Sequence, residues 1–156
     1  LTILHTFAEK EFKSVTSGEL SLETEEEKKA SEEQAEASKP LLDTLREALS
    51  GKVKDVRLSS RLKNHAVCLS SDGPLSIGME KVLNAMPVEN NVKAARVLEL
   101  NADHPLFAKL EALQASGDTD TLKTYADVLF TQAQLIEGIL PEDPAEYSEK
   151  VLQLLR

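Results

Sequence analysis

Apolar positions from residue 52 onwards change their spacing several times, and these changes predict a small sheet combined with helices. Short stretches rich in Val and Leu have the composition of strands, whereas longer stretches with apolar residues every three or four positions have the period of helices. Strands are expected at 53–59, 66–70 and 96–100, and helices at 75–86, 105–115, 120–138 and from 144 to the C-terminus. The order β-β-α-β-α-α-α predicts an α+β fold built on a small three-stranded sheet.

Capping residues mark where several of these helices begin. Asp118 or Thr119 precedes the long helix, and Asp143 precedes the last helix, which has proline in its first position. Asp103 is expected to cap the helix that follows it, and the neighbouring His104 is interpreted as a structural residue. These boundaries therefore depend on individual side chains as well as on periodicity.

The first 50 residues have a different and more polar pattern. Residues 1–7 have helical apolar spacing, residues 12–15 form a strand-like run, and residues 25–37 are a stretch of Glu, Lys and Ala that predicts a solvated helix. Pro40 either kinks that helix or opens a second one at its first turn. An apolar stripe then leads to Gly51, where the helix is expected to stop.

Charge is distributed unevenly along the 156 residues, which hold 18 Lys and Arg against 27 Asp and Glu and carry a net charge of −9. Residues 1–50 hold 12 of the acids and 6 of the bases, so charge and pattern both change near Gly51 and predict a boundary between 1–50 and 51–156. The acidic balance argues against nucleic acid as a partner. No run approaches the ~18 apolar residues of a membrane span, and a single Cys excludes an internal disulfide.

Residue types that carry catalysis or bind metals are scattered along the chain. His5, His65 and His104 lie far apart, without partners at the spacing of metal ligands. Cys68 lies in an apolar strand and is interpreted as a small hydrophobic residue, and the acidic run 25–27 as a solvated helix face. Phosphate-binding and catalytic-serine motifs are absent from the sequence. We therefore expect no catalytic residue, no metal site and no enzymatic activity in this chain.

The helix at 75–86 carries one apolar stripe that contains both methionines of the chain. Its members fall on one helical face and are Leu75, Met79, Val82, Leu83 and Met86. Amphipathic stripes usually pack on a core, so the commoner interpretation is that this stripe covers the sheet. The alternative is an exposed contact surface. Because Met side chains are flexible and polarizable, an exposed stripe of this kind would suit a surface that accepts varied partners.

The last two helices carry apolar arcs that are too wide for a single covered face. In the first, the stripe Leu122, Tyr125, Leu129, Ala133 and Ile136 is widened by neighbours on both sides, and in the second the apolar residues are Tyr147, Val151, Leu152, Leu154 and Leu155. Either a large core or a partner must cover such helices. Two helices from each of two copies would form a four-helix bundle with two-fold symmetry.

Several motifs, in this order, resemble the C-terminal domain of the heat-shock protein 90 chaperones, and the bacterial HtpG type most closely. The segment 98–105 reads Leu-Glu-Leu-Asn-Ala-Asp-His-Pro and is similar to a family signature in which Ala102 is replaced by Pro. The segment 53–62 resembles the strand that enters this domain, and Glu142-Asp143-Pro144 resembles the start of its closing helix. Upstream, 12–15 and the acidic stretch 25–29 look like the end of the family's middle domain.

The resemblance implies a division of labour within a longer chaperone. Residues 1–50 would be the end of the middle domain with an acidic linker helix, and residues 51–156 the C-terminal dimerisation domain. The family consists of ATP-driven chaperones that assist protein folding, and its ATP and Mg²⁺ site lies in an N-terminal domain outside this chain. The fragment itself would thus hold no cofactor, and the bacterial members are cytoplasmic.

The resemblance also implies site residues and partners. The dimer interface would contain Tyr125, Val128, Leu129, Gln132, Ile136, Tyr147, Val151, Leu154 and Leu155. The surface for unfolded or partly folded client proteins would contain Leu75, Met79, Leu83 and Met86. The expected partners are a second copy and client proteins, without nucleic acid or membrane. Two alternatives stay open: a monomeric α+β scaffold or adaptor with no chaperone role, and a small α+β enzyme whose site the sequence does not reveal.

Overall fold

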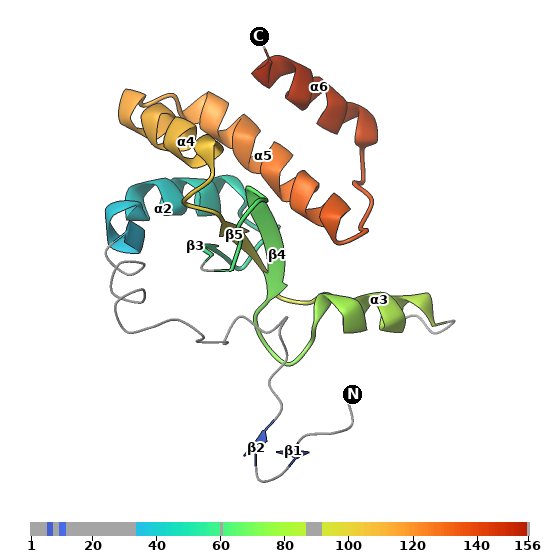
Figure 1. Ribbon diagram of the computed structural model, residues 1–156. Helices are drawn as coiled ribbons and strands as arrows, with labels where there is room; N and C mark the ends of the chain where they lie inside the picture. The colour runs from blue at the N-terminus through green and yellow to red at the C-terminus, as the bar shows by residue number, and fades with distance from the viewer. Residues whose placement is uncertain (1–5, 8–9, 12–33, 60, 87–91, 156) are drawn as a thin grey trace.

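A three-stranded sheet forms the centre of the structure, a computed structural model that describes residues 6–7, 10–11, 34–59, 61–86 and 92–155 (Figure 1). The strands are β3 (Asp55–Leu58), β4 (Val67–Ser71) and β5 (Arg96–Leu100), in the spatial order β3-β5-β4. β5 pairs in parallel with β3, with Leu58 opposite Leu100, and antiparallel with β4, with Val67 opposite the same leucine. The central strand β5 is therefore hydrogen-bonded on both edges.

The helices lie at the positions that the sequence predicts, to within about three residues. They are α2 (Lys39–Ala48), α3 (Ile77–Ala85), α4 (Pro105–Ser116), α5 (Thr119–Ile136) and α6 (Pro144–Leu154). Together with the small sheet they confirm the predicted α+β fold. The bundle across a dimer stays a prediction, because the structure contains one chain.

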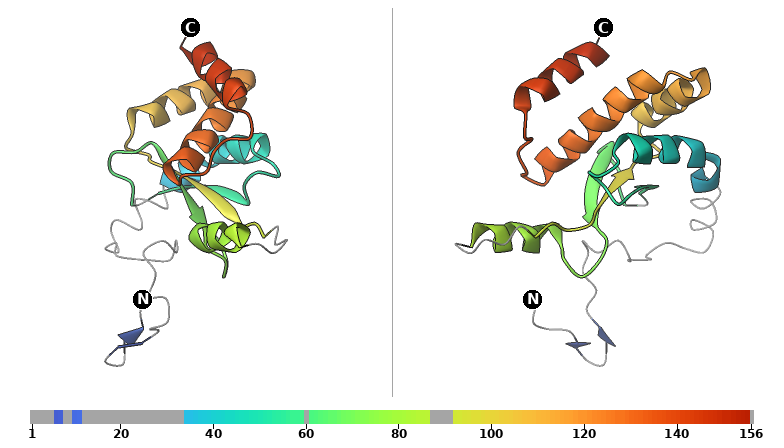
Figure 2. Two further views of the ribbon diagram at one scale, coloured as in Figure 1. Left: turned by 90° about the vertical axis from the view of Figure 1, so that its right-hand side faces the viewer. Right: turned by 180° about the vertical axis from the view of Figure 1, so that it is seen from behind.

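The core lies between the sheet and helices α2, α4 and α5, which gather on one side of it in both views (Figures 1 and 2). β5 alternates between the two faces of the sheet, so Leu98 and Leu100 enter this core while Glu99 lies on the other face. The most deeply buried large side chains are Leu41, Leu45, Leu49, Val67, Val97, Leu98, Leu100, Leu110 and Leu122. Burying each such side chain contributes about 1.5–3 kcal/mol to folding.

Side-chain caps mark the starts of α4, α5 and α6, with one difference from the prediction. The carboxylates of Asp118 and Asp143 accept backbone N–H groups at the starts of α5 and α6, as expected. At α4 the cap is His104, whose Nδ1 accepts the N–H of Leu106 at 3.2 Å, so the prediction of Asp103 as the cap is wrong. Because α4 begins at Pro105, Asp103 lies one residue before the cap position. The N–H of Asp103 donates to Oδ1 of Asn101 at 3.0 Å.

The N-terminal part is described in two short pieces and in the segment that leads into α2. β1 (Thr6–Phe7) pairs antiparallel with β2 (Lys10–Glu11), so the predicted helix at 1–7 is wrong for Thr6 and Phe7. Apolar spacing over so few residues does not separate a helix from a strand. The rest of that prediction, the strand at 12–15 and residues 25–33 of the acidic helix lie outside the described residues.

The region around Pro40 decides between the two alternatives that the sequence leaves open. Residues 34–37 are helical, Ser38 forms a turn, and α2 starts at Lys39 with Pro40 in its first turn. Proline is tolerated there because the first backbone N–H groups of a helix have no partner within it. Pro40 therefore opens a second helical segment. α2 ends at Ala48, and Gly51 follows with a φ of 81°, a conformation that glycine adopts without strain.

Candidate interaction surfaces

Helix α3 projects away from the body of the molecule (Figures 1 and 2). Most of its apolar stripe is exposed. Met79, Val82 and Met86 are 49%, 59% and 47% exposed. Leu75 and Leu83 are half-buried, and Leu75 packs against the edge of the core. Packing on the sheet is the commoner interpretation of such a stripe, and the structure does not bear it out: most of the stripe is exposed. Large apolar side chains exposed together on one helix are typical of an interaction site.

A buried polar contact holds the base of α3 in place. Ile77 and Glu80 are the two buried residues of the helix, and their i,i+3 spacing places them on one side of it. The Glu80 carboxylate accepts the N–H of Ala94 and pairs with Arg96, both at 2.8 Å. Glu80 is not among the residues predicted from the sequence; its signal there is an acid in helical register with a buried apolar residue. The anchor frees the opposite side of α3 for contacts.

A second contact joins α3 to the C-terminal end of α5. The Lys81 Nζ donates to the backbone carbonyl of Glu137, and its distance to the carboxylate of the same residue is 3.8 Å. A cation at this position also interacts favourably with the free carbonyl groups at the end of a helix. The exposed helix and the helical pair α5–α6 are thus linked directly.

Helix α5 turns one face to the core and another to the surface. Six of its residues are buried within the chain: Leu122, Tyr125, Ala126, Leu129, Phe130 and Ala133. Tyr125 and Leu129, both assigned to a dimer interface by resemblance, therefore belong to the core of a single chain. Of the other expected interface residues on α5, Val128 is half-buried, and Gln132 and Ile136 are exposed.

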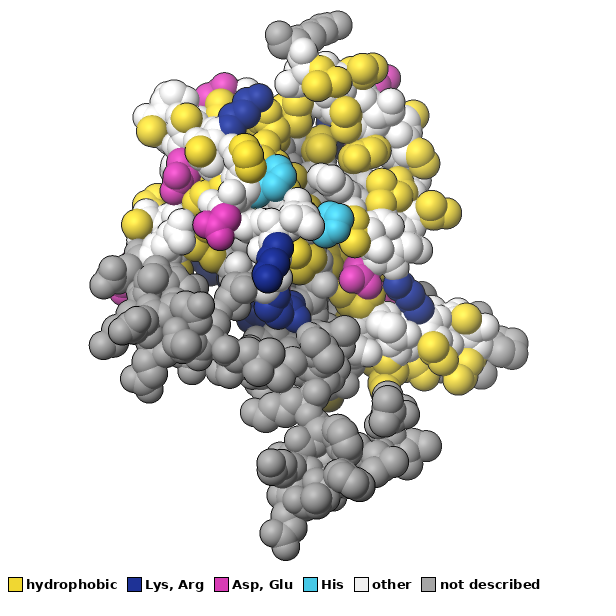
Figure 3. Space-filling view, in the orientation of Figure 1, with side chains coloured by type: hydrophobic (Ala, Val, Ile, Leu, Met, Phe, Trp, Pro, Cys, Tyr) yellow, Lys and Arg dark blue, Asp and Glu magenta, His cyan; other side chains and the backbone are white. Residues whose placement is uncertain are grey.

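Helix α6 is apolar on one side and is covered only in part. The structure describes the whole helix, and none of its residues is buried. Tyr147, Val151 and Leu154 are half-buried, whereas Leu155 is 77% exposed. Hydrophobic side chains gather over α6 and, separately, along α3 in the space-filling view (Figure 3). Apolar side chains are therefore exposed on both helices where the sequence predicts a contact surface, while the surfaces and their partners stay a prediction.

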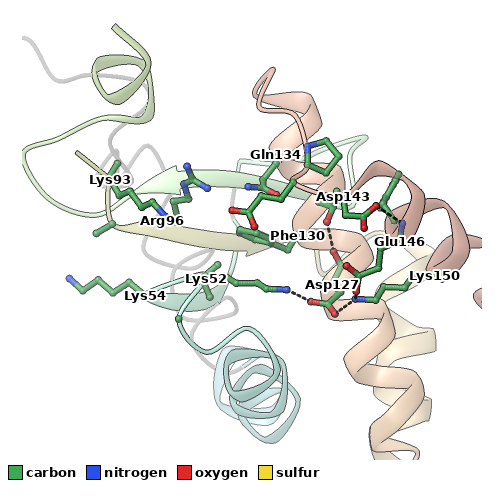
Figure 4. A pocket seen from close by; sticks show the side chains of 18 residues that line it. Lys52, Lys54, Lys93, Arg96, Asp127, Phe130, Gln134, Asp143, Glu146 and Lys150 are labelled. Carbon is green, nitrogen blue, oxygen red and sulfur yellow. Dashed lines mark hydrogen bonds and ion pairs between the residues drawn. The ribbon is translucent and has the colours of Figure 1, made fainter. Parts of the chain in front are cut away.

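A cleft of about 480 Å³ separates the start of α6 from the edge of the sheet (Figure 4). Asp127 of α5 lies in it between two ammonium groups, with Lys52 at 2.7 Å and Lys150 of α6 at 2.6 Å. Burial opposes ionisation of this carboxyl, but hydrogen bonds from the two lysines keep the pKa of Asp127 below its ordinary value. The sequence could not show this cluster, because Lys52 and Asp127 lie 75 positions apart.

A second polar cluster surrounds Glu99 on the sheet face opposite the core. The Glu99 carboxylate pairs with Arg57 at 2.8 Å and Arg61 at 2.9 Å, and accepts the hydroxyl groups of Ser59 and Ser70. Burial raises the pKa of the carboxyl, but these donors outweigh it and lower the pKa of Glu99 to about 2. In contrast, burial and the charge of Glu99 raise the pKa of the neighbouring Cys68 to about 12. This cysteine is half-buried and is held as a thiol.

Neither polar cluster has the composition of a metal site. In the described part of the chain, no three His, Cys, Asp or Glu side chains converge to hold a metal ion. Helices long and apolar enough to cross a membrane are likewise not found among the described residues. The features of the described residues that bear on interactions are the exposed apolar side chains of α3 and α6 and the contacts that position these two helices.

Comparison with known proteins identifies the family of this fold. The family model described as Hsp90 protein matches residues 1–156, the whole chain. The chain belongs to the Hsp90 family. It is 47% identical over 156 residues to the chaperone protein HtpG of Clostridium botulinum (strain Langeland), and 44% identical over 155 residues to that of Bacillus subtilis (strain 168). The two matches cover 100% and 99% of this chain but only 25% of each relative. The chain therefore spans about a quarter of the length of these relatives.

The signature through which the chain resembles the Hsp90 family forms a structural unit in this fold. Its first three residues are the end of β5, and its last residue is the first residue of α4. Between them, the buried Asn101 donates to the backbone carbonyls of Lys63 and His65 at 3.3 and 3.1 Å. His104 then caps α4. The Hsp90 signature therefore turns the chain from the central strand into the helical layer.

Proposed function

We propose that this chain is the dimerisation and client-contact part of an Hsp90-type chaperone that assists protein folding. The C-terminal dimerisation domain would comprise residues 51–156 together with α2, because Leu41 and Leu45 of this helix and Leu49 at its end lie in the same core. The residues before α2 would be the end of the middle domain with its acidic linker. Membership of the Hsp90 family supports the chaperone role. The observation that carries the proposal is that α6, apolar along one side, has no buried residue in the chain that the structure describes.

The dimer surface that we propose differs from the one implied by resemblance alone. Tyr125 and Leu129 are covered within the chain, so a second copy would contact the rest of the set, namely Val128, Gln132, Ile136, Tyr147, Val151, Leu154 and Leu155. Leu152 is exposed beside them. Covering apolar area contributes about 25 cal/mol per Å², and two copies of such a helical pair can associate without nucleotide.

A dimer formed at this end would hold the remaining parts of two chaperone chains near each other. Their association would then be intramolecular, at an effective concentration set by the tether. We further propose that ATP and Mg²⁺ act elsewhere in the parent protein, that this segment contributes no catalytic residue, and that the parent works in the cytoplasm.

We propose α3 as the client-contact helix. Two exposed methionines offer a flexible apolar surface that fits partly unfolded chains of varied sequence. A monomeric scaffold would also fold as this chain does, but it gives no role to two separate exposed apolar helices. The proposal therefore depends on whether these helices bind partners.

The double variant Met79→Ser/Met86→Ser tests the client surface. Both side chains are about half exposed, so we expect the melting temperature to be retained and the affinity for reduced, carboxymethylated α-lactalbumin to fall about tenfold. The matched control Met79→Leu/Met86→Leu keeps the apolar surface and should bind like the wild type. Equal binding by the Ser and Leu variants would reject α3 as the client surface.

A further inference from the structure

Helix α6 packs against α5 at a fixed place although it buries little of itself. Its least exposed apolar side chains, Tyr147, Val151 and Leu154, are only half-buried, so apolar contact within the chain covers the helix only in part. A short helix with so little burial is marginal in isolation and depends on its contacts for position. The polar contacts of α6 are therefore the place to look for what sets its orientation.

Asp127 supplies the polar contact that α6 makes with the rest of the molecule. Among the described residues, its ion pair with Lys150 at 2.6 Å is the one side-chain hydrogen bond that joins α6 to another element. The Lys150 ammonium also lies 2.8 Å from Glu146, one turn earlier on α6. The Lys150 and Asp127 side chains are 27% and 24% exposed, so the pair is partly shielded from solvent but can still be screened by salt.

The other carboxylate oxygen of Asp127 is held from the opposite side of the cleft. Lys52, in the turn between α2 and β3, lies 2.7 Å from Oδ1, whereas Lys150 bonds Oδ2 (Figure 4). Two other cations lie nearby, just before β3 and at the start of β5: Lys54 pairs with Asp72, and Arg96 pairs with Glu80. Asp127 is thus clamped between one lysine of the body and one lysine of α6.

We propose that Asp127 is an electrostatic latch that sets the orientation of α6 on the body and thereby assembles the apolar surface shared by α5 and α6. The dimer consequence rests on the proposed function, whereas the latch itself acts within one chain. Asp127 is a positioning residue, because its carboxylate is occupied by two lysines of its own chain and has no need to contact a second copy.

The latch is tested with Asp127→Asn, which keeps the shape of the side chain and removes its charge. Lys150→Met is the second variant, and Glu47→Gln, on the exposed side of α2, removes one negative charge as a control. Hydrogen exchange is measured for the amides of α6 and of α4, and the dimer dissociation constant by sedimentation equilibrium. We expect both latch variants to raise α6 exchange and the dissociation constant about tenfold in 0.1 M NaCl, with α4 exchange unchanged.

Salt and the wild type separate the latch from the proposed function. In 1 M NaCl the difference between Asp127→Asn and the wild type should shrink, because salt screens a pair of partly exposed charges. If the wild type is monomeric throughout, the proposed dimer fails, but faster α6 exchange in Asp127→Asn still supports the latch. Wild-type exchange of α6 in both latch variants overturns it. Loosened α6 with an unchanged dissociation constant overturns its role in assembling the surface.

Discussion

Glu99 shows how a single buried charge is tolerated in a small fold. Its side chain is 3% exposed, and an unpaired carboxylate at such a site would be strongly destabilising. Two arginines and two hydroxyl groups satisfy both oxygens, and they come from β3, the turn after it and β4. The carboxylate therefore ties the three strands together on the sheet face opposite α2, α4 and α5.

Neutralising this carboxylate should destabilise the chain. Glu99→Gln removes the negative charge that pairs with Arg57 and Arg61, and we expect a loss of about 3 kcal/mol in the free energy of unfolding at pH 7. Urea unfolding of the variant and of the control Glu47→Gln measures this loss. A variant as stable as the control would contradict the structural role given to Glu99.

The same carboxyl should make stability depend on pH. Its pKa is about 2 in the folded chain against an ordinary value of 4.5, so the unfolded state binds the proton more readily. The stabilisation is complete above about pH 5 and is lost as the pH falls towards 2. We expect the stability gap between wild type and Glu99→Gln to narrow over this range, and a gap that stays constant would contradict the depressed pKa.

Cys68 should react slowly with thiol reagents in the folded chain. Burial and the charge of Glu99 raise its pKa to about 12, so very little thiolate is present near neutral pH. We expect its reaction with Ellman's reagent at pH 8 to be at least about tenfold slower than that of free cysteine, and to become fast in urea. Equal rates in the folded and unfolded chain would contradict this environment.

At the scale of elements, α5 contributes side chains to both the core and the surface. This changes the expectation for a substitution at Leu129. From the sequence, Asp at position 129 or 154 is expected to weaken dimerisation. Because Leu129 is buried within one chain, its loss should act on folding first, and Leu129→Ala should cost about 2–4 kcal/mol in stability. Leu155→Asp, at an exposed position, should leave thermal unfolding of the monomer unchanged and weaken the dimer.

Thermal melting and sedimentation of the two variants separate these roles. A dimer that survives Leu155→Asp at low micromolar concentration would exclude this end of α6 from the interface. Wild-type stability of Leu129→Ala would contradict its place in the core.

The sequence predicts the elements well where glycine, proline or a cap marks their ends. Asp118 and Asp143 cap α5 and α6, which start within one residue of the predicted positions. The Val- and Leu-rich strand β5 also lies at its predicted residues. It fails where the signal is short or shared, as at Thr6–Phe7, which form a strand, and at His104, which caps in place of its neighbour. It is ambiguous for α3, because an amphipathic stripe has the same pattern whether it is covered or exposed.

The polar clusters could not be predicted, for a physical reason. Glu99 and Arg57 are 42 positions apart, and Asp127 and Lys52 are 75 apart, so only the folded topology brings them together. In the sequence these residues read as ordinary surface charges. The two apolar helix surfaces could be predicted from the sequence because apolar periodicity is local. The sequence could not show that Tyr125 and Leu129 are buried within the chain and are therefore out of reach of a second copy.

At the scale of the whole molecule, the two exposed apolar helices lie on one connected framework. Glu80 and Arg96 anchor α3 to the start of the central strand β5, Lys81 connects it to the end of α5, and Asp127 connects α5 to α6. A client on α3 and a second copy on α6 would thus bind elements that are joined by direct contacts. If binding at the two surfaces is coupled, each ligand must strengthen the other by the same factor.

Sedimentation equilibrium on the wild-type chain over a range of micromolar concentrations tests the central claim most directly. The protomer mass is 17.1 kDa, and we expect a species of twice that mass that persists to low micromolar concentration and is lost in Leu155→Asp. A mass of 17.1 kDa at every concentration, equal for both proteins, would contradict dimerisation through α5 and α6.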